Sequence, residues 1–408
     1  MNKHWFYFDN YVYVNYIAPN KVLLYNTLNH DLLTYRSNTI YTFISELKSI
    51  ENNGIIDIDL FRLKSENEEL YNFIIEVRAH YMGDLLPIFN IEKKPIVFQS
   101  DPMVLKEEHA YHDFGDSILH NITEMTFYVN NKCSFNCKKC NQYYKQLSCC
   151  HKGEVENEEL SPDIIISCLK GLQESSIFQI NIVGGNILSY TNLNVLVDEL
   201  NQFSFNKTYK INTYHISNIH EIEFILNNSK NSIELLCTNL SEIEKIYSLY
   251  RNIDSLNVKI NFLIQSEEDL NKIETLFRGY ESNIIMTPFY NGDNYDFFKE
   301  NIFVSKEEIK SVSFKDIKRN TILNHFFFGA LVCMSNGDVY SNLNNTKIGN
   351  IKEHSVASMV FKELEEKRSW LKVRKNVEPC NNCLYSSICP PLSNYEEAIG
   401  QNNLCTII

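Results

Sequence analysis

The sequence predicts an α/β protein with three parts: a winged-helix-like domain, an open and partial (β/α)6 barrel, and a cysteine-rich domain. Two short strand-like segments before two amphipathic helices predict the first part, and alternating strands and helices predict the second. Four cysteines in a stretch with almost no regular periodicity predict the third. The expected parts are residues 1–95, a linker over 96–121 with a charged helix at 104–112, the barrel over 122–324, and the cysteine-rich domain over 325–408.

Length and composition limit the classes of function. With 408 residues and 44% hydrophobic content, the chain can form two or three domains with their own cores. Its 38 basic and 51 acidic residues give a net charge of −13, which argues against a protein that grips nucleic acid. No apolar run approaches the roughly 18 residues of a membrane span, so none is expected. The 12 cysteines are clustered, which indicates metal thiolates in a reducing compartment and predicts a cytoplasmic location.

The first part has the element order of a winged-helix-like module. We expect Asn38 to cap its first helix and Gly83 to end its second. Such a module suggests DNA binding, but 9 basic against 12 acidic residues over 1–95, a net charge of −3, argue against that function. The expected strands are 21–29 and 31–36, and the expected helices are 38–50 and 65–83.

Repeated β/α units predict the barrel, because such repeats form a parallel sheet covered by helices. Six units are too few for a closed eight-stranded barrel, so the barrel should be open. Ser161 and Pro162 are expected to begin the first helix. The expected strands are 122–130, 177–183, 208–217, 232–238, 258–265 and 283–289, and the expected helices are 161–174, 191–203, 220–228, 242–250 and 267–277.

Three cysteines follow the first barrel strand at the spacing C-x3-C-x2-C: Cys133, Cys137 and Cys140. In a parallel sheet, chemistry lies at the carboxyl ends of the strands, which is where this loop begins. Three thiolates can hold three irons of a 4Fe-4S cluster and leave the fourth iron open to a small molecule. A structural zinc site with a borrowed ligand, or incidental cysteines, are the alternatives.

The loop and its position resemble those of radical S-adenosylmethionine (radical SAM) enzymes. The resemblance implies that S-adenosyl-L-methionine (SAM) chelates the open iron, and that Gly184, Gly185 and Asn186 line SAM after the second strand. Two residues depart from the family: Lys139 stands where an aromatic residue is usual, and Asn186 stands where a glutamate pairs with the SAM ammonium. Loss of that charged hydrogen bond would weaken binding by about 1.5–3 kcal/mol.

Each motif near the loop has a second interpretation. Gly184-Gly185 alone is most simply a tight strand-to-helix turn. Cys149-Cys150-His151 either packs against the face of the cluster or supplies a substrate-contacting or redox thiol.

The C-terminal cysteines are Cys380, Cys383, Cys389 and Cys405, and they follow an expected hairpin turn at 336–340 and a helix at 356–370. Four thiolates suit either a structural zinc ion or a fully ligated 4Fe-4S cluster, and the spacing hardly separates the two. The cluster loop on the same chain favours iron–sulfur.

This segment resembles a SPASM domain, the auxiliary-cluster extension of radical SAM enzymes that modify peptides. The resemblance implies that the four cysteines hold one auxiliary cluster. A second cluster is not expected, because two of its ligand positions are Asn342 and Ser393. Cys333 is a weak ligand candidate and is more simply a buried small hydrophobe.

The first domain resembles the winged-helix leader-binding element of systems that mature ribosomally made peptides (RiPPs). That element takes a precursor peptide as an added strand on its sheet; a structural cap for the barrel is the alternative. The resemblances together imply a radical SAM/SPASM maturase of a ribosomally synthesised precursor peptide. A pseudo-radical-SAM protein of the Bacteroidetes type, which binds the peptide for a second, active maturase, is the alternative, and a structural iron or zinc protein is a third hypothesis. No residue outside the cysteine loops stands out as a catalytic acid or base.

Overall fold

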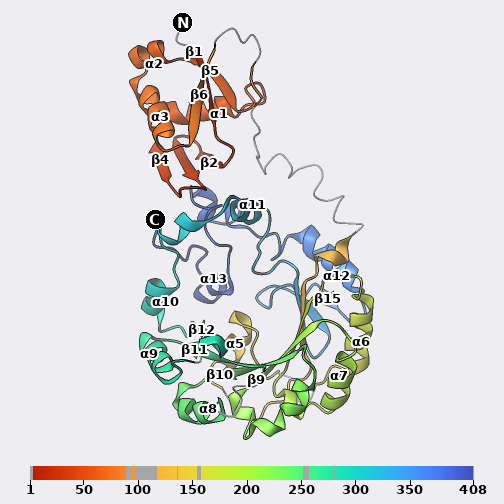
Figure 1. The fold of residues 1–408 in the computed structure, drawn as a ribbon. Coiled ribbons are helices and arrows are strands. Elements are labelled where there is room, and N and C mark those ends of the chain that lie inside the picture. The colour runs from red at the N-terminus through yellow and green to blue at the C-terminus, as the bar shows by residue number, and fades with distance from the viewer. Residues whose placement is uncertain are drawn as a thin grey trace.

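The computed structural model describes residues 3–88, 94–96, 117–135, 137–153, 158–250, 257–279 and 281–407. The charged helix expected at 104–112 lies outside the described residues. The N-terminal domain lies above the C-terminal segment, and the central sheet curves beneath both (Figure 1).

In its described residues, the N-terminal domain contains two three-stranded antiparallel sheets and three helices. Buried side chains such as Phe6, Ile44 and Phe73 form their common core. One sheet has the order β5 (Ile55–Asp59), β1 (Lys3–Phe8), β6 (Gly83–Pro87), and the other has the order β2 (Val12–Ile17), β3 (Lys21–Asn26), β4 (Leu32–Arg36). The helices are α1 (Asn38–Leu47), α2 (Leu60–Glu66) and α3 (Glu68–Ala79).

Two expected helix ends in this domain are wrong. The N-cap of α1 is Ser37, whose hydroxyl accepts the Ile40 N–H at 3.2 Å, and Asn38 is already helical. Helix α3 ends at Ala79, and Gly83 instead begins β6. A Cβ at Gly83 would lie 2.5 Å from the Tyr7 carbonyl oxygen, so this glycine allows two strands to approach closely.

The central sheet contains nine strands in the described residues, in the order β12-β11-β10-β9-β8-β7-β13-β14-β15. The six strands from β7 to β12 are parallel, as the repeated β/α units predict. Strand β13 pairs in parallel with β7, and β14 and β15 follow in antiparallel pairing. One sheet therefore runs from the barrel into the C-terminal segment. The bounds are β7 (Glu124–Tyr128), β8 (Gln179–Val183), β9 (Asn206–Asn212), β10 (Asn231–Cys237), β11 (Val258–Ile264), β12 (Ile284–Pro288), β13 (Ala330–Cys333), β14 (Asp338–Tyr340) and β15 (Gly349–Asn350).

Helices cover the outer face of this sheet, and α5 (Cys140–Gln146) and α13 (Asn394–Ile399) lie on its inner side (Figure 1). Ser161 caps the first outer helix as expected, and Pro162 is its first residue. The helix expected at 220–228 forms two short 3-10 turns, η4 (Ile219–Glu221) and η5 (Glu223–Asn227). The remaining helices are α6 (Pro162–Gly171), α7 (Leu193–Leu200), α8 (Ile243–Tyr250), α9 (Glu267–Leu276), α10 (Tyr295–Asn301), α11 (Phe314–Ile322) and α12 (Val356–Glu366).

The inner face of the sheet is polar, which is unusual for a parallel sheet. Alternate residues of each strand point outward into the apolar core, for example Met125 and Phe127. The residues between them hydrogen-bond across strands: the Thr287 hydroxyl donates to the Asn261 side-chain oxygen at 2.8 Å, and the Asn261 amide donates to Glu234 at 2.7 Å. A polar inner face suits contact with water or with a polar ligand. Among the described residues, no helix is both long and apolar enough to cross a membrane.

Candidate functional site

The three loop cysteines lie between the end of β7 and the start of α5, at the carboxyl edge of the sheet. All three thiols are half-buried. The Cys133 sulfur lies 3.5 Å from His215 Nε2, and the backbone N–H of Lys152 donates to the Cys140 sulfur at 3.4 Å. Cys137 and Cys140 line a cavity of about 560 Å³. The loop therefore gathers soft ligands at the expected edge of the sheet.

Burial is the main influence on these thiols, and it raises the pKa of Cys133, of Cys140, and of Cys137 to about 11. Cys150, the second thiol after the loop along the chain, also raises the pKa of all three, and its Coulombic effect on them exceeds that of any other thiol. Free thiols of this kind are protonated at neutral pH, so binding of iron has to release protons.

Cys149 and Cys150 pack beside the loop. Their sulfurs are 3.7 Å apart, and both residues belong to an apolar cluster against which Cys137 packs. The Tyr128 hydroxyl donates to the Cys149 carbonyl at 2.9 Å, and the Asn212 side-chain amide donates to the Cys150 sulfur at 3.5 Å. Donation from the Cys149 thiol and from Asn212 lowers the pKa of Cys150. This contact agrees with the interpretation that the pair packs against the loop.

The glycine motif is bonded to the start of the cysteine loop. The Gly185 N–H donates to the Asn130 carbonyl at 2.9 Å, and the Asn186 N–H donates to the Lys132 carbonyl at 2.5 Å. A Cβ at Gly185 would lie 2.2 Å from the Lys132 carbonyl oxygen. The motif thus permits close packing of two backbone segments, which is the structural interpretation of Gly184-Gly185.

The Asn186 side chain caps the turn that follows it. Its oxygen accepts the Leu188 N–H at 3.1 Å. It carries no negative charge for an ammonium group, and one of its acceptor positions is already used. Lys139, at the other departing position, donates to the Asn291 carbonyl at 2.7 Å. As it stands, Asn186 fits the amino group of SAM poorly.

Two residues of this site, Asn212 and His215, were not predicted from the sequence. Asn212 is the last residue of β9, and His215 lies three residues later. Burial lowers the pKa of His215 to about 4, so its imidazole is neutral at pH 7. Position at a strand's carboxyl end is the one signal that could have found them.

The four C-terminal cysteines line a single small cavity. Cys380 and Cys389 are buried, and Cys383 and Cys405 are half-buried. Burial raises the pKa of Cys389 to about 12. Four thiols around one cavity are the ligand number of a 4Fe-4S cluster or a zinc ion, and either would keep this irregular segment folded.

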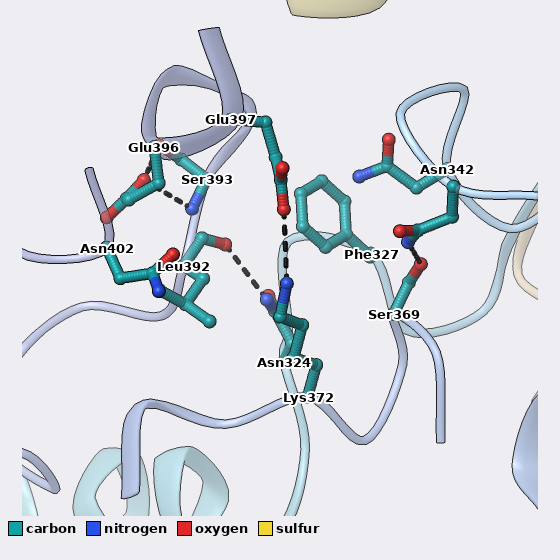
Figure 2. A pocket seen from close by; sticks show the side chains of 11 residues that line it. Asn324, Phe327, Asn342, Ser369, Lys372, Leu392, Ser393, Glu396, Glu397 and Asn402 are labelled. Atoms are coloured by element: carbon teal, nitrogen blue, oxygen red, sulfur yellow. Dashed lines mark hydrogen bonds and ion pairs between the residues drawn. The ribbon is translucent and has the colours of Figure 1, made fainter. Parts of the chain in front are cut away.

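A buried ion pair holds the same segment together. Arg374 Nη2 lies 2.6 Å from Glu396 Oε1, and their side chains are 7% and 2% exposed. Arg374 also donates to the carbonyl oxygens of Pro391 and Asn402, and its Nη1 lies 3.8 Å from the Cys380 sulfur. Figure 2 shows Glu396 at Ser393, where α13 begins, close to the surface pair of Lys372 and Glu397.

The N-terminal domain contacts this cysteine-rich segment directly. The Asn15 amide donates to the Leu384 carbonyl at 2.7 Å, and the Tyr25 hydroxyl donates to the Lys310 carbonyl, which precedes the segment, at 2.8 Å. Leu23 and Tyr25 share an apolar cluster with Cys389. Strand β3 therefore packs on the segment that carries the predicted auxiliary ligands.

In the part of the chain that the structure describes, no three His, Cys, Asp or Glu side chains form a group that could hold a metal ion. Both sets of cysteine ligands stay predictions. Cys333 is fully buried in the main core, as expected of a small hydrophobe, and burial raises its pKa.

Comparison with solved structures finds proteins with a similar fold. The crystal structure of Streptococcus suis SuiB matches with a TM-score of 0.51 and 12% sequence identity, and the match covers 98% of this chain and 100% of SuiB. SuiB bound to the precursor peptide SuiA matches with a TM-score of 0.48 and 13% identity over 98% of each chain. Native anSMEcpe with bound AdoMet matches with a TM-score of 0.43 and 14% identity over 65% of this chain and 88% of anSMEcpe.

No protein-family model and no curated protein matches the chain. The chain has a SuiB-like fold over 98% of its length, with a small N-terminal domain rich in strands and a mostly parallel sheet. This confirms the predicted mixed α/β architecture in its coarse form.

Proposed function

We propose that the chain takes part in maturation of a ribosomally made precursor peptide, which binds to its N-terminal domain. The fold resembles that of radical SAM peptide maturases, and SuiB has been crystallised with its precursor peptide SuiA. The observation that carries the proposal is strand β4, which ends its sheet and has a strand neighbour on one side in the described residues. An open strand edge is a general receptor for an extended peptide.

The register of β4 identifies the groups that a peptide would meet. The Asn26 N–H donates to the Asp31 carbonyl. In an antiparallel pair, every second residue bonds to the same neighbour, so the backbone groups of residues 33 and 35 also face β3. Leu32, Thr34 and Arg36 then direct their backbone groups to the free edge. An added strand would bond to these three residues.

The test is binding of the leader peptide of the precursor encoded beside this chain's gene, measured by calorimetry. Thr34→Pro removes an outward N–H and should weaken binding about tenfold, while Thr34→Val keeps the N–H and should bind like wild type. Equal binding by all three proteins would contradict the proposal.

Two chemical roles are compatible with peptide binding. The capped Asn186 side chain and the engaged Lys139 favour a pseudo-radical-SAM partner that holds the peptide for a second, active maturase. The three cysteines at the carboxyl end of β7 favour the second candidate, an enzyme whose 4Fe-4S cluster supplies the electron that cleaves SAM. In both roles Cys380, Cys383, Cys389 and Cys405 would hold an auxiliary cluster.

Formation of 5′-deoxyadenosine separates the two roles. The protein is reconstituted anaerobically with iron and sulfide, and SAM and dithionite are added, with the Cys133→Ala/Cys137→Ala/Cys140→Ala variant as control. Wild type without product, but with leader binding intact, supports the partner role. Product that is lost in the triple variant supports the enzyme.

A further inference from the structure

A fourth thiol, Cys150, lies beside the loop that carries Cys133, Cys137 and Cys140. Cys137 packs against the apolar cluster that contains Cys150, and the N–H of Lys152, two residues later, donates to the Cys140 sulfur at 3.4 Å. The chain therefore leaves the loop through α5 and returns to it at residues 149–152. This return brings one more soft ligand to the three already there.

We propose that Cys150 is the fourth thiolate ligand of a 4Fe-4S cluster held by Cys133, Cys137 and Cys140. The inference rests on the proposed cluster at this loop and adds to it the ligand of the remaining iron. On binding, the Cys150 thiol releases its proton to water and its sulfur bonds to iron. A cluster with four thiolates resembles those of ferredoxins and has no iron open to SAM.

The fold fixes the segment around Cys150 on three sides. The Asn212 amide donates to the Cys150 sulfur at 3.5 Å, and the Tyr128 hydroxyl holds the preceding carbonyl at 2.9 Å. The His151 N–H donates to the Gly184 carbonyl at 3.1 Å, which ties the segment to the end of β8. Ligands positioned in this way by neighbouring strands need little rearrangement to bind.

Cys149 is a poor candidate for the same role. Its sulfur lies 3.7 Å from the Cys150 sulfur, but it is the Cys150 sulfur that accepts the Asn212 amide. Cys149 is fully buried among Tyr143, Leu236 and other apolar side chains. Cys149→Ala is therefore a matched control that removes a thiol from the same place in the chain.

The first measurement uses the unmutated full chain. After anaerobic reconstitution, the difference between the electron paramagnetic resonance (EPR) spectra of reduced wild type and of the Cys133/Cys137/Cys140 triple alanine variant gives the signal of the loop cluster. We expect added SAM to leave this signal unchanged. Mild oxidation with ferricyanide should leave about four irons on the loop, because each has a protein ligand.

Variants of Cys150 should leave one iron of the loop cluster without a protein ligand. In Cys150→Ala, and in Cys150→Ser if alanine prevents folding, SAM should shift the EPR signal, and oxidation should remove about one iron to leave a three-iron signal. Cys149→Ala should behave like wild type. These readouts do not depend on any product of catalysis.

Three results would overturn the inference: a SAM-dependent shift in wild type, a three-iron signal from oxidised wild type, or identical behaviour of the Cys149 and Cys150 variants. Equal iron content in wild type and in the triple variant would instead show that the loop holds no cluster. Leader binding and its loss in Thr34→Pro report separately on the peptide-binding function.

Discussion

Gly185 packs directly against the backbone at the start of the cysteine loop. The ideal Cβ position at Gly185 is 2.2 Å from the Lys132 carbonyl oxygen, a backbone atom that cannot move aside without shifting the loop. Gly185→Ala should lower the free energy of unfolding by about 1–3 kcal/mol, measured by urea denaturation. Gly171 at the end of α6 has nothing within 4 Å of the same position, so Gly171→Ala should be neutral or slightly stabilising. Equal effects of the two changes would refute the packing role.

His215 gives the metal-free protein a pH dependence with a defined sign. Its pKa is 6.5 when unfolded and about 4 when folded, so between these values the unfolded chain binds a proton that the folded chain does not. Stability should therefore fall as pH drops from 6.5 to 4, by at most about 1.4 kcal/mol per pH unit for this residue. In His215→Gln this part of the fall should vanish. Above pH 7 the two proteins should differ by a constant amount, and a difference that keeps changing there would contradict the assignment.

At the scale of elements, the cysteine-rich segment has little regular structure, and the buried ion pair of Arg374 and Glu396 contributes to its stability. Glu396→Gln leaves the Arg374 charge buried without its partner, which should cost about 3–5 kcal/mol. Release of the segment after α12 should appear as faster limited proteolysis and loss of iron from the C-terminal site.

The neighbouring pair of Lys372 and Glu397 provides the control. Their side chains are 34% and 42% exposed, and exposed pairs contribute about 0–1 kcal/mol. Glu397→Gln should therefore leave proteolysis and iron content unchanged. Similar losses in both variants would mean that the segment responds to any change at α13.

The sequence predicts those elements whose signals are local. The six parallel strands are runs of five to seven residues, most of them largely apolar and long enough to recognise. The sheet formed by β5, β1 and β6 was not predicted, because β1 pairs with partners some 50 and 80 residues away. The same limit applies to the site. Its cysteines follow from spacing, but the approach of Asn212 and Cys150 depends on how β7 and β9 lie in the sheet.

At the scale of the whole molecule, the N-terminal domain and the predicted auxiliary site share an interface. Tyr25 on β3 contacts Lys310 and packs near Cys389. A Cys380→Ser/Cys383→Ser variant, which lacks two of the predicted auxiliary ligands, should therefore lose protection from amide hydrogen exchange over residues 21–26. Residues 40–47 of α1 face the domain's own core and should keep theirs. Equal loss in both segments would indicate unfolding of the domain instead of a loosened interface.

The pairing of β7 with both β8 and β13 also limits how this protein can be divided. A chain that stopped before β13 would turn β7, the strand that leads into the cysteine loop, into an exposed edge with unpaired N–H and C=O groups. Such edges recruit other chains and cause aggregation. The parallel strands β7 to β12 and strand β13 therefore form one unit, and a truncated chain that ends before residue 330 should aggregate where the full chain does not.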